Sequence, residues 1–272
     1  MTIMYHYCDL NAFLSIISNK RLWLSSARNM NDYMEISWFM DKFETKLISE
    51  IEQSLANEFI KFIRINNPTP YICSFSKNGD LLSQWRAYAS DGSGISIGFE
   101  STCFGIRHTI PFPNNDISYV IGIAEVLYDT IKQDSFINQA ISKLKSSEIK
   151  DPSKKKGLFY EALKIINGMA CISKNPAFSE ENELRIIHTP LIERDDSNFK
   201  MISNISNIKH RVSCNRLTSY FEYSFYQNND TPSIKEIIMG PKCNTDMQDI
   251  KDVLLCNGFP NVVIKNSTAS YR

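Results

Sequence analysis

Strand-like and helix-like segments alternate irregularly along this chain, without the regular strand–helix–strand rhythm of a parallel α/β sheet. Amphipathic helical patterns are strongest in two stretches, and short apolar strand patterns fill most of the rest. No internal repeat is present. We therefore expect one α+β domain over residues 1–272. Its sheet is expected to be irregular, mostly antiparallel and split, flanked by helices, with helical insertions at about 33–65 and 133–172.

Composition narrows the function classes before any motif does. Thirty Lys and Arg residues balance thirty Asp and Glu residues, which argues against a whole surface built for nucleic acid or an anionic membrane, although a local basic groove stays open. No run of eighteen apolar residues and no basic-then-apolar leader is present, so we expect a soluble, cytoplasmic protein with no membrane partner. The seven cysteines are odd in number and none forms a Cys-x-x-Cys pair, which favours reduced thiols over disulfides or structural zinc.

The stretch from 174 to 188 carries the most chemistry. After a helix-breaking polar run it takes the pattern of a strand, in which successive side chains point to opposite faces. Glu181, Glu183 and Arg185 then share one face, and Leu184 and Ile186 share the other. Two carboxylates beside a cation can hold different pKa values, so that one accepts a proton while the other stabilises positive charge. A solvated edge strand with a single Glu–Arg ion pair is the alternative.

Short strands and amphipathic helices account for the remaining pattern. Strands are predicted at 1–7, 21–26, 71–76, 95–99, 105–110, 119–128, 234–239 and 262–265. Helices are predicted after Asp9, continuously from about 33 to 65, at 81–89, twice within 133–172, and after Asn244. Asp32 and Glu35 have the spacing of a helix capping box. Residues 193–207 are polar and predict a loop, either a mobile cover or a plain surface loop.

No familiar motif for a phosphate loop, a nucleophile or a metal is present. The glycines at 92 and 94 precede a strand, no Gly-x-Ser-x-Gly elbow occurs, and the four dispersed histidines do not form a zinc pattern. A scattered polar set remains, for which the structural alternatives are a hydrogen-bonded core histidine, turn-capping serines and a core tryptophan. Its members are His6, the corner from Ser25 to Asn31, Ser74, Ser76, Trp85, Tyr88, Glu181, Glu183 and Arg185.

Several short stretches of the chain form a series: Met4–Tyr7, Leu22–Ser26, Asn31–Glu35, Cys73–Ser76, Trp85–Ala89, Gly94–Phe99, Glu181–Arg185 and Ile237–Pro241. Together they resemble the block pattern of domain-of-unknown-function family 2971, a mostly bacterial family. The blocks occur in the family's order and span nearly the whole chain, to the terminal Tyr271-Arg272. This resemblance names a family and implies no activity.

A second resemblance concerns three shorter motifs. Tyr5-His6-Tyr7, followed by a short helix and Arg21-Leu22, resembles the opening of ADP-ribosyltransferases, particularly the DNA-targeting toxin branch, in which a first-strand histidine and the next helix hold NAD. The Ser-x-Ser at 74–76 and the Glu-x-Glu at 181–183 come in the order that arginine-type ADP-ribosyltransferases use. The chain thus joins the first-strand histidine of one branch to the other two motifs of another.

That second resemblance implies an ADP-ribosyltransferase-like core with NAD as substrate. The N-glycosidic bond of NAD breaks through an oxocarbenium-like state, which a carboxylate facing the developing cation stabilises. Glu183 is predicted in that role, and Glu181 is predicted to orient or deprotonate the acceptor. The predicted NAD-binding set is His6 on a ribose hydroxyl, Tyr88 or Trp85 stacking on nicotinamide or the target base, Arg28 or Arg185 on the pyrophosphate, and Ser25, Ser74 and Ser76 around them.

The leading hypothesis is an NAD-consuming ADP-ribosyltransferase-like enzyme or NAD glycohydrolase. It would be a bacterial toxin or phage-defence effector that modifies a nucleic acid or a protein, with an antitoxin or defence-system protein as a partner. Two alternatives stay open. One is a non-catalytic binding or sensing module of a defence system, in which the Glu/Arg face makes structural ion pairs. The other is a Mg²⁺-dependent nuclease, which requires four acids to converge: Asp32, Glu35, Glu181 and Glu183.

Overall fold

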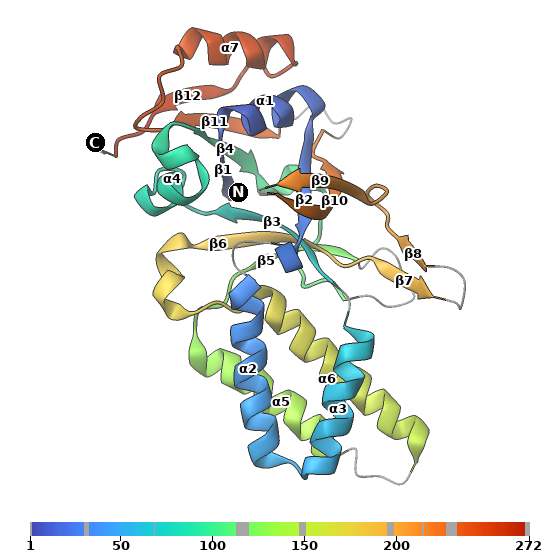
Figure 1. Cartoon of the computed structure of the whole chain (residues 1–272). Coiled ribbons are helices and arrows are strands. Elements are labelled where there is room, and N and C mark those ends of the chain that lie inside the picture. Colours follow the sequence, from blue (N-terminus) through green and yellow to red (C-terminus); the bar gives the residue numbers. More distant parts are fainter. Residues whose placement is uncertain are drawn as a thin grey trace.

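Figure 1 shows the fold in a computed structural model, which describes residues 2–29, 33–67, 69–112, 120–146, 151–194, 199–213, 215–226 and 233–269. The strands are β1 (Ile3–Cys8), β2 (Arg21–Ser26), β3 (Tyr71–Ser76), β4 (Ile95–Glu100), β5 (Ile121–Glu125), β6 (Glu183–His188), β7 (Leu191–Arg194), β8 (Phe199–Ile202), β9 (Lys209–Ser213), β10 (Arg216–Ser224), β11 (Ile234–Met239) and β12 (Val263–Asn266). The helices are α1 (Leu10–Asn19), α2 (Tyr33–Glu50), α3 (Gln53–Asn66), α4 (Leu82–Tyr88), α5 (Thr130–Lys145), α6 (Pro152–Ile172) and α7 (Met247–Cys256).

Most of these strands form one open sheet. Its order is β12-β11-β4-β1-β3-β2-β10-β9, with β6 attached to β3 and β5 attached to β6. Neighbouring strands are antiparallel except β11 and β12, which are parallel. β7 and β8 form a separate two-stranded sheet. A mixed α/β fold with an open, mostly antiparallel sheet confirms the fold class expected from the sequence.

The sheet splits along one edge of β3. The other edge of β3 pairs with β6 over its whole length, from Tyr71 to Ser76. On the split edge, β1 pairs only at the last residue, through Tyr5 opposite Ser76, and β2 pairs only at the first two, through Ser25 and Ser26. Residues 73–75 therefore have no strand partner on this edge, because β1 and β2 diverge around them.

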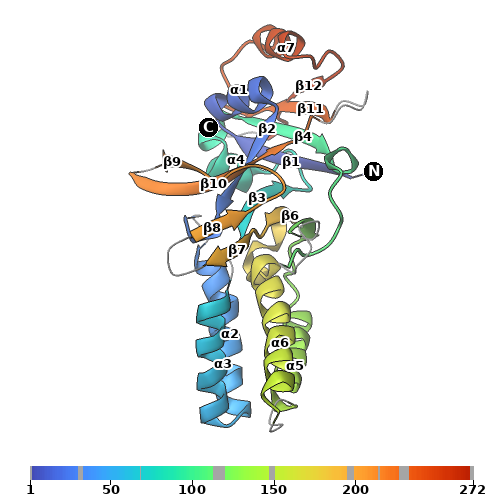
Figure 2. The same ribbon diagram turned by 90° about the vertical axis from the view of Figure 1, so that its right-hand side faces the viewer.

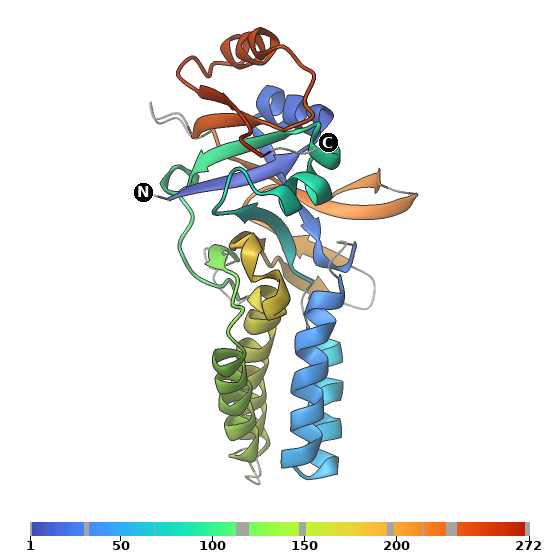
Figure 3. The ribbon, with the colours of Figure 1, turned by 90° about the vertical axis from the view of Figure 1, so that its left-hand side faces the viewer.

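Four long helices project together from the side of the sheet that carries β5 and β6 (Figures 2 and 3). In Figure 2, α2 runs beside α3 and α5 runs beside α6, and both pairs contact one another closely. Their apolar stripes meet in one core, where the Phe59 ring packs against Phe43 and Phe159. Ile72 of β3 and Ile187 of β6 belong to this core. The bundle therefore rests on β3, which borders the split, and on β6, which pairs with the other edge of β3.

The prediction of one continuous helix over 33–65 is wrong, because the chain turns between two helices. The chain forms α2 and then α3, and Glu52 between them has an extended backbone (φ −54°, ψ 135°). Both helices bury their stripes in the same core, from Phe39 in α2 to Ile63 in α3. The apolar period therefore continues across the turn, and periodicity alone cannot reveal the break.

Two further predictions need correction. Residues 105–110, predicted as a strand, make an isolated bridge between His108 and Ile123, because Gly105 leaves the preceding short helix with a left-handed backbone (φ 64°). The polar segment 193–207, predicted as a loop, contains the end of β7 and all of β8, and backbone pairing holds these two strands together despite their weak apolar pattern. Of the predicted capping box, Asp32 and the side chain of Glu35 lie outside the described residues.

Helix α4 is held against β1 by an aromatic contact and by a glycine. Trp85 is fully buried and packs edge-on against Tyr7, with ring centroids 4.8 Å apart. A Cβ atom at Gly94, in the turn after α4, would lie 2.2 Å from the backbone oxygen of Cys8, so glycine lets this turn reach β1. Through these contacts α4 holds Tyr88 beside the split in the sheet.

His188, at the end of β6, gives the fold an expected sensitivity to acid. It is completely buried, its Nδ1 lies 3.0 Å from the Val120 carbonyl oxygen, and burial lowers its pKa from 6.5 to about 4. As the pH falls from 6.5 to about 4, the unfolded chain takes up a proton that the folded chain does not, so stability is lost across this window. We expect this residue to cost about 3 kcal/mol of unfolding free energy once the pH is below the folded-state pKa.

Substitution of His188 tests this expectation. His188→Asn keeps a donor toward Val120 and removes the titrating ring, so its unfolding free energy should fall less steeply with pH than that of the wild type. Urea denaturation at a series of pH values measures both curves. His210→Gln, which removes an exposed histidine from β9, is the control and should follow the wild-type curve. Parallel curves for His188→Asn and the wild type would refute the role of His188.

Candidate functional site

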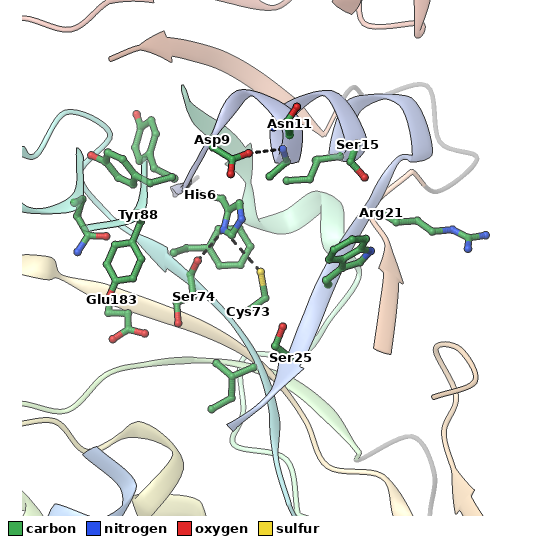
Figure 4. Close-up of a pocket in the computed structure, with 18 of the residues that line it drawn as sticks. His6, Asp9, Asn11, Ser15, Arg21, Ser25, Cys73, Ser74, Tyr88 and Glu183 are labelled. Atoms are coloured by element: carbon green, nitrogen blue, oxygen red, sulfur yellow. Dashed lines mark hydrogen bonds between the residues drawn. The ribbon is translucent and has the colours of Figure 1, made fainter. Parts of the chain in front are cut away.

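A pocket of about 600 Å³ lies at the split in the sheet (Figure 4). Consecutive residues of β3, from Ile72 to Phe75, line it. The pocket therefore follows the edge of β3 that the split leaves without a strand partner. Residues of α1, β1, β2, α4, β6, β9 and β10, with Glu181 just before β6, complete its walls.

One side of the pocket holds two carboxylates that share a buried lysine. Lys174 Nζ lies 2.6 Å from Glu181 Oε2 and 3.3 Å from Glu183 Oε2. Arg185 binds Glu183 through two parallel hydrogen bonds, from Nε to Oε1 at 2.7 Å and from Nη2 to Oε2 at 2.9 Å. Its Nη1 donates to the Cys171 carbonyl oxygen near the end of α6 at 2.8 Å. Lys174 and Arg185 are 1% and 2% exposed, so solvent screens these pairs little.

Glu183 is held as a carboxylate. Burial acts to raise its pKa, but the charge and hydrogen bonds of Arg185, the charge of Lys174 and a hydrogen bond from Ser74 outweigh burial and hold the pKa below 4.5. An ionised carboxylate offers about four acceptor positions, and these donors occupy most of them. Glu183 therefore presents a fixed negative charge to the pocket and is poorly suited to accept a proton.

The sequence predicts Glu181 on the same strand as Glu183, which is wrong. Glu181 is the last residue of a short 3₁₀ helix (Pro176–Glu181), and Asn182 then turns the chain with a left-handed backbone (φ 44°) before β6 begins. Asparagine is one of the few residues that adopt this conformation readily. The two carboxylates still meet, because Lys174 bridges them.

His6 reaches into the gap between β1 and β2. Its ring is half-buried, and Nδ1 lies 3.0 Å from the Ser74 carbonyl oxygen. Because a carbonyl oxygen only accepts, Nδ1 carries the proton and Nε2 is left as an acceptor. Burial lowers the pKa of His6, with the hydrogen bond to Ser74 opposing that effect. The imidazole is therefore neutral at physiological pH and can accept a hydrogen bond from a ligand hydroxyl.

Several of the residues predicted from the sequence line the pocket: His6, Ser25, Ser74, Tyr88, Glu181 and Glu183. Figure 4 shows Tyr88 and Glu183 on one side of His6, and Ser25 with Arg21 on the other. Tyr88 is 39% exposed, so part of its side chain faces solvent at the pocket. The structure thus brings the first-strand histidine and the acidic pair to one hollow.

Other predicted residues do not line it. Arg28 is exposed beyond the end of β2. The Ser76 hydroxyl donates to the Glu181 carbonyl oxygen at 2.7 Å. Ser76 therefore holds the turn before β6, which is the turn-capping role that was the alternative to ligand binding. Trp85 is fully buried, which makes it a core residue and excludes it as a stacking surface for a ligand. Arg185 is not among the lining residues, and its guanidinium binds Glu183 and the Cys171 carbonyl oxygen.

Three residues that matter to the pocket were missed from the sequence. Lys174 stands at the head of the acidic stretch, and a basic residue so close to two acids could have been noticed as their partner. Trp23 and Arg211 both line the pocket, yet they are far apart in sequence and meet because β10 pairs with both β2 and β9. No local sequence motif predicts that strand pairing.

Membrane-spanning helices and metal sites are two further features that bear on function. Within the described ranges, no helix is long and apolar enough to cross a bilayer. The same part of the chain contains no group of three or more His, Cys, Asp or Glu side chains arranged to hold a metal ion. For the nuclease alternative, Glu181 and Glu183 meet around an ammonium group, and the remaining two acids fall outside what the structure describes.

The segment that carries the acidic side of the pocket also carries a family match. Residues 84–186 match the family model described as protein of unknown function, DUF2971. This match supports, over that segment, the resemblance to family 2971 noted in the sequence. No curated protein and no solved structure matches the chain significantly. The DUF2971 match runs from α4 into β6 and includes Tyr88, Glu181 and Glu183, whereas β1 with His6 lies outside it.

Proposed function

We propose that this protein is an NAD-consuming enzyme of the ADP-ribosyltransferase kind, and that its pocket takes the nicotinamide ribose of NAD. One observation carries the proposal: His6 from the first strand and Glu183 from a strand far along the chain line a single pocket, together with Ser74 and Tyr88. The acceptor in this proposal is a nucleic acid or a protein. The biological role is that of a bacterial toxin or phage-defence effector restrained by a partner protein.

In this proposal Glu183 stabilises positive charge on the ribosyl ring. The bond from C1′ to the nicotinamide nitrogen breaks, its electron pair leaves with nicotinamide, and no acid is needed to protonate the leaving group. Glu183 suits this step because Arg185 and Lys174 keep it ionised and fixed, and a preorganised charge needs no rearrangement as the reaction proceeds. An acceptor hydroxyl or amine, or water, then bonds to C1′ and gives its proton to Glu181.

The other pocket residues bind and orient. His6 accepts a hydrogen bond from a ribose hydroxyl through Nε2, which the contact of Nδ1 with Ser74 leaves available. Tyr88 stacks its half-exposed ring on nicotinamide. Ser74 donates its hydroxyl to Glu183 and so helps to hold the carboxylate toward the ribose.

A binding or sensing module without turnover is the second candidate, and one observation favours it. The Glu183 carboxylate is already engaged by Arg185, Lys174 and Ser74. If those contacts persist in the filled pocket, little acceptor capacity is left for a ribose hydroxyl. In that function the pocket binds a nucleotide and the ion pairs serve the fold.

Release of nicotinamide separates these candidates. The purified chain is incubated with NAD alone and with RNA, DNA or cell lysate, and free nicotinamide is quantified by chromatography while NAD binding is followed by thermal shift. The enzyme is expected to release nicotinamide above the protein-free rate, with ADP-ribose either free or attached to an acceptor. A thermal shift without release under any condition favours the module and overturns the enzyme. Loss of nucleic acid that depends on Mg²⁺ favours the nuclease.

A further inference from the structure

A second side of the pocket is basic and aromatic, and none of the roles above uses it. Arg211 of β9 lines the pocket, with its guanidinium carbon 4.7 Å from the ring centre of Trp23 on β2. The same carbon lies 5.8 Å from the ring of Tyr220 on β10, and the two aromatic rings are themselves 4.8 Å apart. Because β10 pairs with both β2 and β9, these three side chains stand together on one face of the sheet.

Among the residues that the structure describes, no carboxylate balances the charge of Arg211. Its Nη2 donates to Ser25 Oγ at 3.1 Å, while its buried Nε has no hydrogen-bond partner among the same residues. Across the part of the chain that the structure describes, no carboxylate lies within ion-pair distance of it. The neighbouring cations differ, since Arg21 and Lys209 both bind Glu222. A buried donor without an acceptor costs free energy, and an anionic ligand would supply the missing acceptor.

The chemistry of this side suits a phosphate group. A guanidinium presents a planar fork of donors that matches two phosphate oxygens, and the aromatic rings beneath it hold that plane in place. Ser25 adds a hydroxyl beside the fork. The carboxylates of Glu181 and Glu183 repel an anion from the other side of the pocket. A ligand with a phosphate at one end and a cationic ring at the other therefore has one favoured orientation.

We propose that Arg211, Trp23 and Ser25 form a phosphate-binding subsite that takes the diphosphate of a nucleotide. It lies on the side of His6 opposite Glu183, where Figure 4 shows Ser25. The identity of that nucleotide as NAD rests on the proposed function, whereas the subsite itself needs no turnover. It takes the role that the sequence assigns to Arg28 or Arg185, because Arg28 does not line the pocket and Arg185 is engaged by Glu183.

Calorimetric titration with ADP and with adenosine tests the subsite without any reaction. The wild-type chain is expected to bind ADP at least about tenfold more tightly than adenosine, because a charged, forked contact to phosphate is worth that much or more. Arg211→Gln should remove most of this preference, and Arg211→Lys, which keeps the charge but loses the fork, should fall between them. Inorganic pyrophosphate should compete with ADP for the wild type.

Arg216→Gln is the matched control, since it removes an exposed arginine from the same hairpin outside the pocket and should bind ADP as the wild type does. Thermal unfolding of each variant identifies any that fails to fold. If Arg211→Gln does not fold, the comparison of Arg211→Lys with the wild type tests the subsite. Equal affinity for ADP and adenosine in the wild type, or an unchanged preference in both Arg211 variants, overturns the subsite. ADP binding that depends on Arg211 without nicotinamide release would keep the subsite and overturn the enzyme. Normal release of nicotinamide by Arg211→Gln with an unchanged KM would keep the enzyme and overturn the subsite.

Discussion

Glu183→Gln is expected to lower the rate of nicotinamide release by about 10²–10³-fold, because it removes the preorganised charge that the developing oxocarbenium ion faces. NAD binding should change far less, since the charge acts chiefly in the transition state. The measurement is a single-turnover assay at saturating NAD, with the dissociation constant for NAD determined separately. The amide has nearly the size of the carboxylate, so the pocket keeps its shape while the charge is lost.

Two companion variants make that result specific. Glu181→Gln makes the same chemical change in the carboxylate that shares Lys174, and it should slow transfer to an acceptor more than it slows hydrolysis by water. Glu161→Gln removes an exposed carboxylate in the helical bundle and should leave the rate unchanged. If Glu183→Gln retained the wild-type rate, or lost it only because the protein unfolded, Glu183 would not be the catalytic residue.

Arg185→Leu is expected to destabilise the fold by about 3–5 kcal/mol, which is the usual cost of leaving a buried charge without its partner. Arg185 makes two hydrogen bonds to Glu183 and one to the backbone of Cys171, and all three groups are buried. The loss would therefore affect both β6 and its junction with α6. Urea denaturation at neutral pH measures the change in the free energy of unfolding.

A surface ion pair provides the comparison. Lys143→Leu breaks an exposed pair with Glu161 and should cost less than about 1 kcal/mol. The double variant Arg185→Leu/Glu183→Leu removes both buried charges and is expected to be more stable than Arg185→Leu alone, because Glu183 then no longer lacks the charge and the two hydrogen bonds of Arg185. A loss in Arg185→Leu as small as that in Lys143→Leu would show that the buried cluster contributes little to stability.

Local patterns predicted the strands that border the pocket. The short apolar runs in 71–76 and 184–187 predicted β3 and β6 correctly, because both strands are buried along nearly their whole length. Helical periodicity did less well for 33–65, since α2 and α3 bury one continuous stripe. The period of an apolar pattern shows which side of an element is buried. It does not show where one element ends and the next begins when both bury their apolar residues in the same core.

The acidic side of the pocket was more predictable than the basic side. Short motifs brought His6, Ser74 and Glu183 into one hypothesis, and they line one pocket. Trp23 and Arg211 were out of reach, because their meeting depends on the order in which distant strands enter the sheet. A spacing between two residues predicts contact only within an element or across a short turn. Trp85 was predicted at the site but lies in the core. Aromatic side chains fill cores as well as line ligand pockets, so residue type alone does not distinguish the two.

A crystal structure of Glu183→Gln with NAD tests the central claim most directly, because the slowed reaction should leave the substrate intact. We expect the nicotinamide ribose beside residue 183 and within hydrogen-bond distance of His6, with the diphosphate turned toward Arg211. NAD bound elsewhere on the surface, or bound in this pocket with its ribose turned away from both residues, would contradict the account.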